Sequence, residues 1–84
     1  MKTYIYILTN PFTKKGVILE TNKQNYNIYE QQKKYKCCGL QIFCVDKNSN
    51  IETLLHLINM SNKGYTFDKN IENVLYNINS KYNL

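Results

Sequence analysis

The stretches "TYIYILTNP" at residues 3–11 and "GVILETN" at residues 16–22 decide the fold that we expect for this chain. Residues 4–8 are aromatic or aliphatic, a composition that suits a pleated, largely buried surface and is typical of a β-strand. Pro11 ends this run because it has no backbone N–H to give to a sheet, and Gly16 adds a flexible point before the apolar pattern resumes. The two stretches therefore predict a β-hairpin with a basic loop.

The remainder of the chain alternates between helical and extended patterns. Good helix formers across residues 25–36 predict a helix, and the apolar run "LQIFCV" at 40–45 predicts a third strand, which we place at the centre of the sheet. Apolar residues then recur at helical spacing across 51–60 and across 71–82. We therefore expect a single domain spanning 1–84, with an α+β fold, a small three-stranded sheet, flanking helices and the element order β-β-α-β-α-α.

Polar residues before each expected helix are candidates for capping its free backbone N–H groups. Thr21 and Asn22 precede the first helix. Ser49 and Glu52 stand at the S-x-x-E spacing of a capping box before the second helix, and Asp68 precedes the last one. These residues predict where the three helices begin.

Composition limits the class of partner and the compartment. The 84 residues include eleven lysines, no arginine and six acidic residues, which give a formal net charge of +5. This excess favours an acidic partner such as nucleic acid, although it is also ordinary for a small soluble protein. An odd count of three cysteines without a C-x-x-C pair favours neither a zinc site nor a disulfide framework and indicates a reducing compartment. The apolar run at Ile5–Leu8 is too short for a signal sequence or a membrane span, so we expect a cytoplasmic protein, or one in the cytosol or nucleus of a host cell.

The hairpin, with "YIYILTNP" followed by "VILETN", resembles the opening of the GIY-YIG nuclease superfamily, most closely its phage and large-virus branch. The likeness covers residues 4–22, and the element order expected above is that of the superfamily. The resemblance implies a metal-dependent hydrolysis of phosphodiester bonds by strand tyrosines, an arginine on the first helix and a glutamate on a later helix. In physical terms, the tyrosine acts on the attacking water, the arginine neutralises the developing charge, and the metal held by the glutamate stabilises the leaving oxygen.

Carried over residue by residue, the resemblance places Tyr6 at the first family tyrosine, and Glu52 and His56 at the later helix, where Glu52 would hold Mg²⁺ or Mn²⁺. Val17 and Leu19 stand where the family has tyrosine or lysine and glycine, and valine cannot move a proton. The absence of arginine removes the planar fork that binds phosphate. Glu52 also fits a capping box and His56 the border of an apolar helix face, neither of which needs a metal. We therefore expect Tyr6, Glu52 and His56 to be catalytic only if activity survives, and no cofactor otherwise.

The leading functional hypothesis is a catalytically degenerate GIY-YIG-like protein of viral or mobile-element type, which binds nucleic acid or a nucleoprotein without efficient cleavage. Its candidate contacts are lysines for phosphate groups and tyrosines for stacking on bases. These residues are Lys14, Lys15, Lys23, Lys33, Lys34, Tyr4, Tyr6, Tyr26 and Tyr29. The lysines would equally suit a solvated surface, and those near the end of the first helix would complement its dipole.

Two alternatives remain open on the sequence. One is a small phage- or virus-encoded inhibitor that binds a host protein, such as a nucleic-acid-handling defence enzyme. The short chain, the degenerate motif and the abundance of Asn, Lys, Tyr and Ile, which is typical of an AT-rich genome, favour this alternative. The other is an active metal-dependent endonuclease with a rearranged site. We expect no membrane partner, and a second copy of the chain could pair along an uncovered sheet edge or the polar stripe of the last helix.

Overall fold

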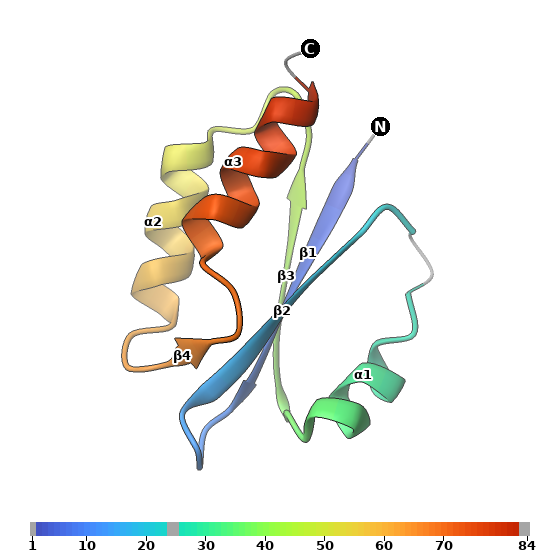
Figure 1. Ribbon diagram of the computed structural model, residues 1–84, viewed down its shortest axis with the longest axis vertical. Coiled ribbons are helices and arrows are strands. Elements are labelled where there is room, and N and C mark those ends of the chain that lie inside the picture. Colours follow the sequence, from blue (N-terminus) through green and yellow to red (C-terminus); the bar gives the residue numbers. More distant parts are fainter. Residues whose placement is uncertain (1, 24–25, 83–84) are drawn as a thin grey trace.

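In the computed structural model, which describes residues 2–23 and 26–82, a sheet is flanked by helices on both faces (Figure 1). The elements follow in the order β1 (Thr3–Asn10), β2 (Lys15–Thr21), α1 (Ile28–Tyr35), β3 (Gly39–Val45), α2 (Ile51–Ser61), β4 (Thr66–Phe67) and α3 (Ile71–Tyr82). The helix expected across 25–36 is present but shorter at both ends, and its expected first residue lies outside the described residues. The α+β class is therefore as expected, whereas the strand count is not.

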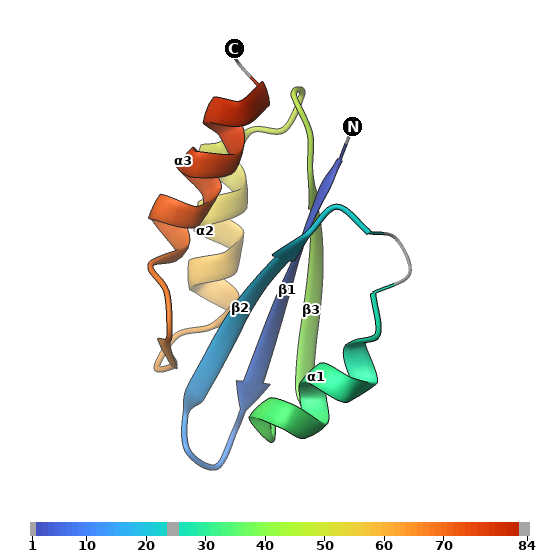
Figure 2. The ribbon, with the colours of Figure 1, turned by 45° about the vertical axis from the view of Figure 1, so that its right-hand side comes forward.

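The sheet has four strands in the order β3-β1-β2-β4, and Figure 2 shows β1 between β2 and β3. β1 pairs antiparallel with both neighbours, and β4 is parallel to β2. The expected three-stranded sheet with the order β-β-α-β-α-α is wrong, because the observed order is β-β-α-β-α-β-α. The central position expected for β3 is also wrong. Its run is apolar on both faces, yet only one is covered: Val45 is buried, whereas Ile42 is 54% exposed.

The short strand β4 is joined to β2 by hydrogen bonds that follow a parallel ladder. Thr66 N–H donates to the Lys14 carbonyl at 2.9 Å, and Asp68 N–H donates to the Gly16 carbonyl at 3.3 Å. The Asp68 carboxylate then accepts from the Ile18 N–H at 3.0 Å, so a side chain continues the ladder where the backbone of β4 ends. A strand of two residues has no visible period, which is why the sequence did not predict it.

The two faces of the sheet carry different layers, with α2 and α3 on one side and α1 on the other (Figure 1). Alternate strand residues point to opposite faces, so Ile5 and Ile7 face α2 and α3 while Tyr6 and Leu8 face the α1 side. The core between the sheet and the two later helices is apolar and consists of Ile5, Ile7, Ile18, Val45, Ile51, Ile58, Leu75 and Ile78. The helices predicted across 51–60 and 71–82 therefore do pack on the sheet through apolar residues, but Leu57 and Met60 of the first are 49% and 55% exposed and lie outside the packed face.

Asparagines cap all three helices in the described part of the chain. Asn27 Oδ1 accepts from the Glu30 N–H at 3.3 Å before α1, and Asn50 and Asn70 make the corresponding bonds before α2 and α3, each at 3.1 Å. Asparagine caps about as well as serine or aspartate, because its side-chain oxygen reaches the same N–H groups.

The capping residues predicted from the sequence have other roles. Thr21 Oγ1 accepts from the N–H of Lys23 in the loop, and Ser49 Oγ accepts from the Asp46 N–H before α2 begins. The capping box expected at Ser49 and Glu52 is therefore wrong: the N-cap is Asn50, and the residue three positions after it is Thr53 instead of Glu52. Asp68 binds the sheet edge instead of capping α3.

Candidate nucleic-acid interface

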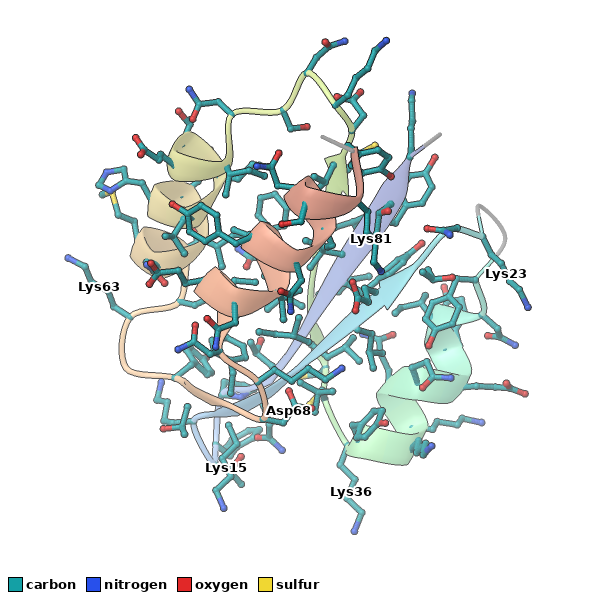
Figure 3. The ribbon with its side chains drawn as sticks, turned by 45° about the horizontal axis from the view of Figure 1, so that its top comes forward. Lys15, Lys23, Lys36, Lys63, Asp68 and Lys81 are labelled. Atoms are coloured by element: carbon teal, nitrogen blue, oxygen red, sulfur yellow. The ribbon has the colours of Figure 1, made fainter. Side chains whose placement is uncertain are left out.

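The net positive charge belongs to the first half of the sequence. Residues 1–45 contain seven lysines and two acidic residues, whereas residues 46–84 contain four of each, so the formal charge of +5 lies wholly in the first segment. That segment forms β1, β2, α1 and β3. Figure 3 shows Lys15, Lys23 and Lys36 pointing outward from the hairpin turn and the region around α1. We call this surface the basic face; its exposed lysines are Lys14, Lys15, Lys23, Lys33, Lys34 and Lys36.

The Asn10 side chain positions the hairpin turn and ties it to the end of α1. Its Oδ1 accepts from the N–H groups of Phe12 at 2.9 Å and Thr13 at 3.2 Å, which closes the turn. Its Nδ2 donates to the Lys36 carbonyl at 2.9 Å, across to the other element of the basic face. One asparagine therefore holds the two lysine-bearing segments side by side.

The end of α1 is closed by a left-handed residue. Lys36 has φ of +56°, and the N–H of Cys37 donates to the Gln32 carbonyl at 3.0 Å, which satisfies a carbonyl that the helix leaves free. Lys33 and Lys34 lie in the last turn, where positive charge also complements the helix dipole. The backbone thus presents three lysines at one end of α1, next to the hairpin turn.

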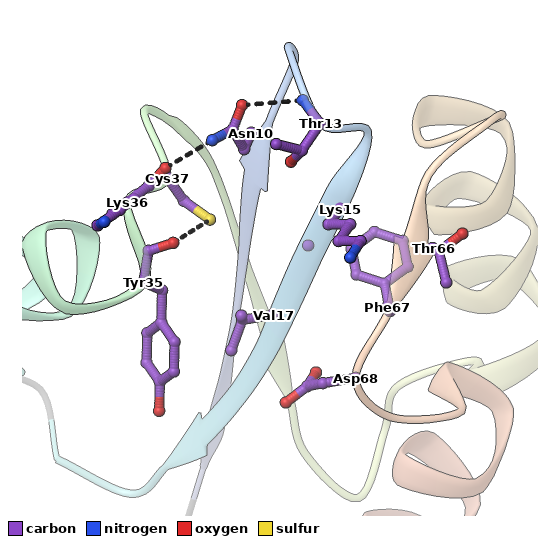
Figure 4. A pocket seen from close by; sticks show the side chains of 11 residues that line it. Asn10, Thr13, Lys15, Val17, Tyr35, Lys36, Cys37, Thr66, Phe67 and Asp68 are labelled. Atoms are coloured by element: carbon purple, nitrogen blue, oxygen red, sulfur yellow. Dashed lines mark hydrogen bonds between the residues drawn. The ribbon is translucent and has the colours of Figure 1, made fainter.

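A cavity of about 460 Å³ opens between these two segments and β4 (Figure 4). Val17 of β2 lies between a wall at the end of α1 and a wall on β4, and Lys15 and Lys36 lie on opposite sides. The lining is mostly apolar, with a few polar groups. It consists of Asn10, Thr13, Lys15, Gly16, Val17, Tyr35, Lys36, Cys37, Thr66, Phe67 and Asp68. A mostly apolar hollow with few polar groups is the usual form of a small-ligand site.

The Cys37 thiol in the cavity wall is held in its neutral form. Burial, and to a smaller extent the neighbouring Cys38, raises the pKa of Cys37 above its ordinary value. The Cys37 Sγ–H donates to the Tyr35 carbonyl at 3.4 Å. A protonated and buried thiol is a poor nucleophile, so Cys37 acts as a packing residue here. Cys38 and Cys44 are exposed free thiols.

The two most exposed aromatic rings among the described residues belong to the same segment, while Tyr76 on α3 is 43% exposed. Phe12 in the hairpin turn is 92% exposed, and Tyr29 on α1 is 76% exposed. Tyr6, in contrast, is buried, and its ring lies 5.2 Å from that of Tyr26. Tyr4 is half-buried on the same sheet face as Tyr6. Of the tyrosines predicted to stack on bases, Tyr29 is therefore the most available, whereas Tyr6 and Tyr26 contact each other.

The residues predicted to form a catalytic site do not come together. Tyr6 faces the α1 side of the sheet, while Glu52 and His56 are exposed on α2, which covers the opposite face. The sheet thus separates Tyr6 from both. Within residues 2–23 and 26–82, no group of three His, Cys, Asp or Glu side chains is arranged to hold a metal ion. Glu52 lies in the first turn of α2, where its negative charge interacts favourably with the positive end of the helix dipole.

Most of the cavity could not be predicted from the sequence. Lys15 was among the predicted contacts, but Val17 stood out only as a departure from a motif, and the patterns around Tyr35 and Asp68 predicted a helix and a helix cap. Asp68 follows Val17 by about fifty residues, and no local spacing connects them. The only available signal was the loop "GYTFD" between the two later helices, where a threonine and a phenylalanine suit a short strand.

Comparisons of the chain with models of known protein families, with curated proteins and with solved structures find no match. In the part of the chain that the structure describes, no helix has the length and apolar character needed to cross a membrane.

Proposed function

We propose that this protein binds nucleic acid through its basic face and does so without efficient cleavage. The observation that carries the proposal is the placement of charge: the whole formal excess of +5 belongs to residues 1–45, and the exposed rings of Phe12 and Tyr29 belong to the same segment. Lysines that neutralise phosphates release bound counterions, and exposed rings stack on unpaired bases. The α2–α3 side offers no comparable excess of charge.

The resemblance of residues 4–22 to the GIY-YIG nucleases supports the same class of ligand. The placement of Tyr6 and Glu52 on opposite sides of the sheet supports the second half of the proposal, because both groups would have to reach one phosphodiester bond. The chain also has no arginine to stabilise the negative charge that develops on the phosphate during phosphodiester hydrolysis. The function proposed is therefore binding of nucleic acid without the cleavage chemistry that the resemblance implies.

The test is fluorescence anisotropy of labelled single-stranded and duplex DNA and RNA over a series of salt concentrations. If Lys14, Lys15, Lys33, Lys34 and Lys36 contact phosphates, the slope of log affinity against log salt for single strands is about −3.5, or about a hundredfold loss between 50 and 200 mM salt. The double variant Lys33→Gln with Lys34→Gln reduces the magnitude of the slope by about 1.4.

A matched control removes two lysines from the other half of the fold. Lys63 and Lys69 are exposed and lie outside the basic face, so their double replacement by glutamine leaves the slope unchanged. The same samples, incubated with Mg²⁺ or Mn²⁺, are examined for cleavage of supercoiled DNA and structured RNA. An affinity that does not depend on salt, or an equal reduction of the salt slope in both double variants, would refute binding through the basic face. Metal-dependent cleavage that is lost in Glu52→Gln would instead support the endonuclease alternative.

A second candidate, binding of a host protein, is favoured by the uncovered face of β3. Leu40 and Ile42 are 39% and 54% exposed, and Cys44, the next residue on that face, is also exposed. β3 is the terminal strand of the sheet and contains no charged residue that would block pairing with another chain. A partner could add a strand along this edge and cover the three side chains.

This candidate is tested by thiol-specific cross-linking in a lysate of host cells, with Cys38, the other exposed thiol, replaced by serine so that the cross-link starts from Cys44. This otherwise wild-type protein should attach to one host protein, and Ile42→Lys should abolish that product, because the charge would be buried under the partner. Leu57→Lys, at a similarly exposed site on α2, serves as the control. A product formed equally by wild type and Ile42→Lys would exclude recognition through β3.

A further inference from the structure

We propose that the cavity between the hairpin, α1 and β4 receives one unpaired guanine base of the bound strand, with the phosphates beside that base held by Lys15 and Lys36. The inference rests on the proposed function and specifies which part of a nucleic acid the site recognises. It arises from the juxtaposition of three chemically different groups around one hollow: an aromatic wall, a carboxylate and two lysines on opposite sides.

The size and lining of the cavity suit a base. Its volume of about 460 Å³ lies within the range of roughly 300–1,000 Å³ that is usual for small-ligand sites. Val17 and the ring of Tyr35 provide apolar and aromatic surface, on which a base can pack or stack. A base inside a duplex could not enter, so the cavity selects a nucleotide that is single-stranded or turned out of the helix.

The charges around the cavity suit the phosphates that flank such a base. Lys15 and Lys36 line the hollow on the hairpin side and on the α1 side (Figure 4). The hydrogen bond from Asn10 to the Lys36 carbonyl holds these two segments at a fixed separation. An extended strand that enters between them would pass one phosphate near each ammonium group while its base occupies the interior.

Asp68 supplies the preference for guanine. Its Oδ1 accepts the Ile18 N–H at 3.0 Å, which fixes the carboxylate at the border of the cavity, and Figure 4 shows the side chain pointing from β4 towards Val17. An ionised carboxylate only accepts hydrogen bonds and has more acceptor positions than one N–H can use. Guanine presents two neighbouring donors, N1–H and the N2 amino group, on its pairing edge. Each of the other bases places an acceptor beside its donor, which would face the carboxylate unfavourably.

The test compares four thymine-rich single strands of ten nucleotides that differ at one central position, which is guanine, adenine, cytosine or thymine. We expect wild-type protein to bind the guanine strand at least about tenfold more tightly than the other three. Asp68→Asn retains an oxygen for the Ile18 N–H but adds a donor, so the preference should fall to within about threefold while the fold, checked by circular dichroism, is kept. Val17→Phe fills the hollow and should remove the preference.

The double variant Lys33→Gln with Lys34→Gln is the matched control, because it should weaken all four strands equally. If wild-type protein binds the four strands with equal affinity and a steep salt dependence, the base site is refuted and the proposed function stands. If no strand binds, the proposed function fails. Titration of isotope-labelled protein with guanosine monophosphate then tests whether the cavity binds a guanine nucleotide without the rest of the strand. Amide shifts at Val17, Tyr35 and Asp68 that adenosine monophosphate does not cause would support the base site, and their absence would refute it.

Discussion

Replacement of Asn10 by alanine removes three hydrogen bonds at once and tests how the hairpin is joined to α1. The lost bonds are those from the Phe12 and Thr13 N–H groups and the one to the Lys36 carbonyl, at 2.9, 3.2 and 2.9 Å. Each contributes about 0.5–1.5 kcal/mol net, and all three are exposed, so the lower half of the range applies and we expect a loss of about 2 kcal/mol. In a domain of this size that loss lowers Tm by roughly 8–16 °C.

The assay is urea unfolding followed by far-UV circular dichroism, with the urea slope checked for constancy between variants. Asn10→Asp keeps both acceptor bonds of the turn and loses the donor to Lys36, so it should lose about 0.7 kcal/mol, roughly a third of the effect. Asn48→Ala is the control, because no hydrogen bond of the Asn48 side chain is found among the described residues; it should change stability by less than about 0.5 kcal/mol. An effect of Asn10→Ala as small as that of the control would show that these three hydrogen bonds do not hold the hairpin to α1.

Three further changes test the core and the packing of β4. Ile7→Ala, at a fully buried position, should lower the free energy of unfolding by about 2–5 kcal/mol, against less than about 1 kcal/mol for Leu57→Ala at a site that is 49% exposed; equal losses would contradict the core assignment. Gly16→Ala would place a Cβ against the Phe67 ring, so we expect a loss of about 1–3 kcal/mol, and unchanged stability would mean that β4 does not pack there. Because the pKa of Cys37 is raised in the folded protein, the contribution of this thiol to the free energy of unfolding is complete below the thiol pKa of the unfolded chain. That contribution is lost as the pH rises through the thiol pKa of the folded protein. The stability difference between wild type and Cys37→Ala, measured by urea unfolding, should therefore shrink above a pH of about 8.5, and a constant difference would show that the thiol does not titrate differently on folding.

The sequence predicted the elements that have a strong period and missed those that depend on distant contacts. The hairpin at residues 3–22 and the apolar faces of α2 and α3 follow from local patterns, and Ile7, Ile58 and Ile78 occupy the core. β4 could not be predicted, because its two residues form a strand only where β2 offers a free edge. The edge position of β3 could not be predicted either, because an apolar run does not distinguish a central strand from an edge strand.

The helix caps and the candidate site show the same limit. Asp68 has the chemistry of a cap, yet its carboxylate binds the Ile18 N–H fifty positions earlier in the chain, because that N–H lies unpaired at the sheet edge. The sequence predicted the lysines of the basic face other than Lys36 as candidate contacts, since charge is visible residue by residue. It could not predict the cavity around Val17, which exists only after three separate segments have met. Glu52 and Tyr6 carry a motif likeness, but alternation along β1 and the packing of α2 place them on opposite sides of the sheet.

The central claim, that the basic face binds nucleic acid, is tested most directly by recording the amide spectrum of isotope-labelled protein during titration with a single-stranded oligonucleotide. We expect shifts at Phe12–Val17 in the hairpin turn and across α1 to Cys37, with the outer surfaces of α2 and α3 unchanged. Shifts confined to α2 and α3, or to the uncovered edge of β3, would rule out binding through the basic face.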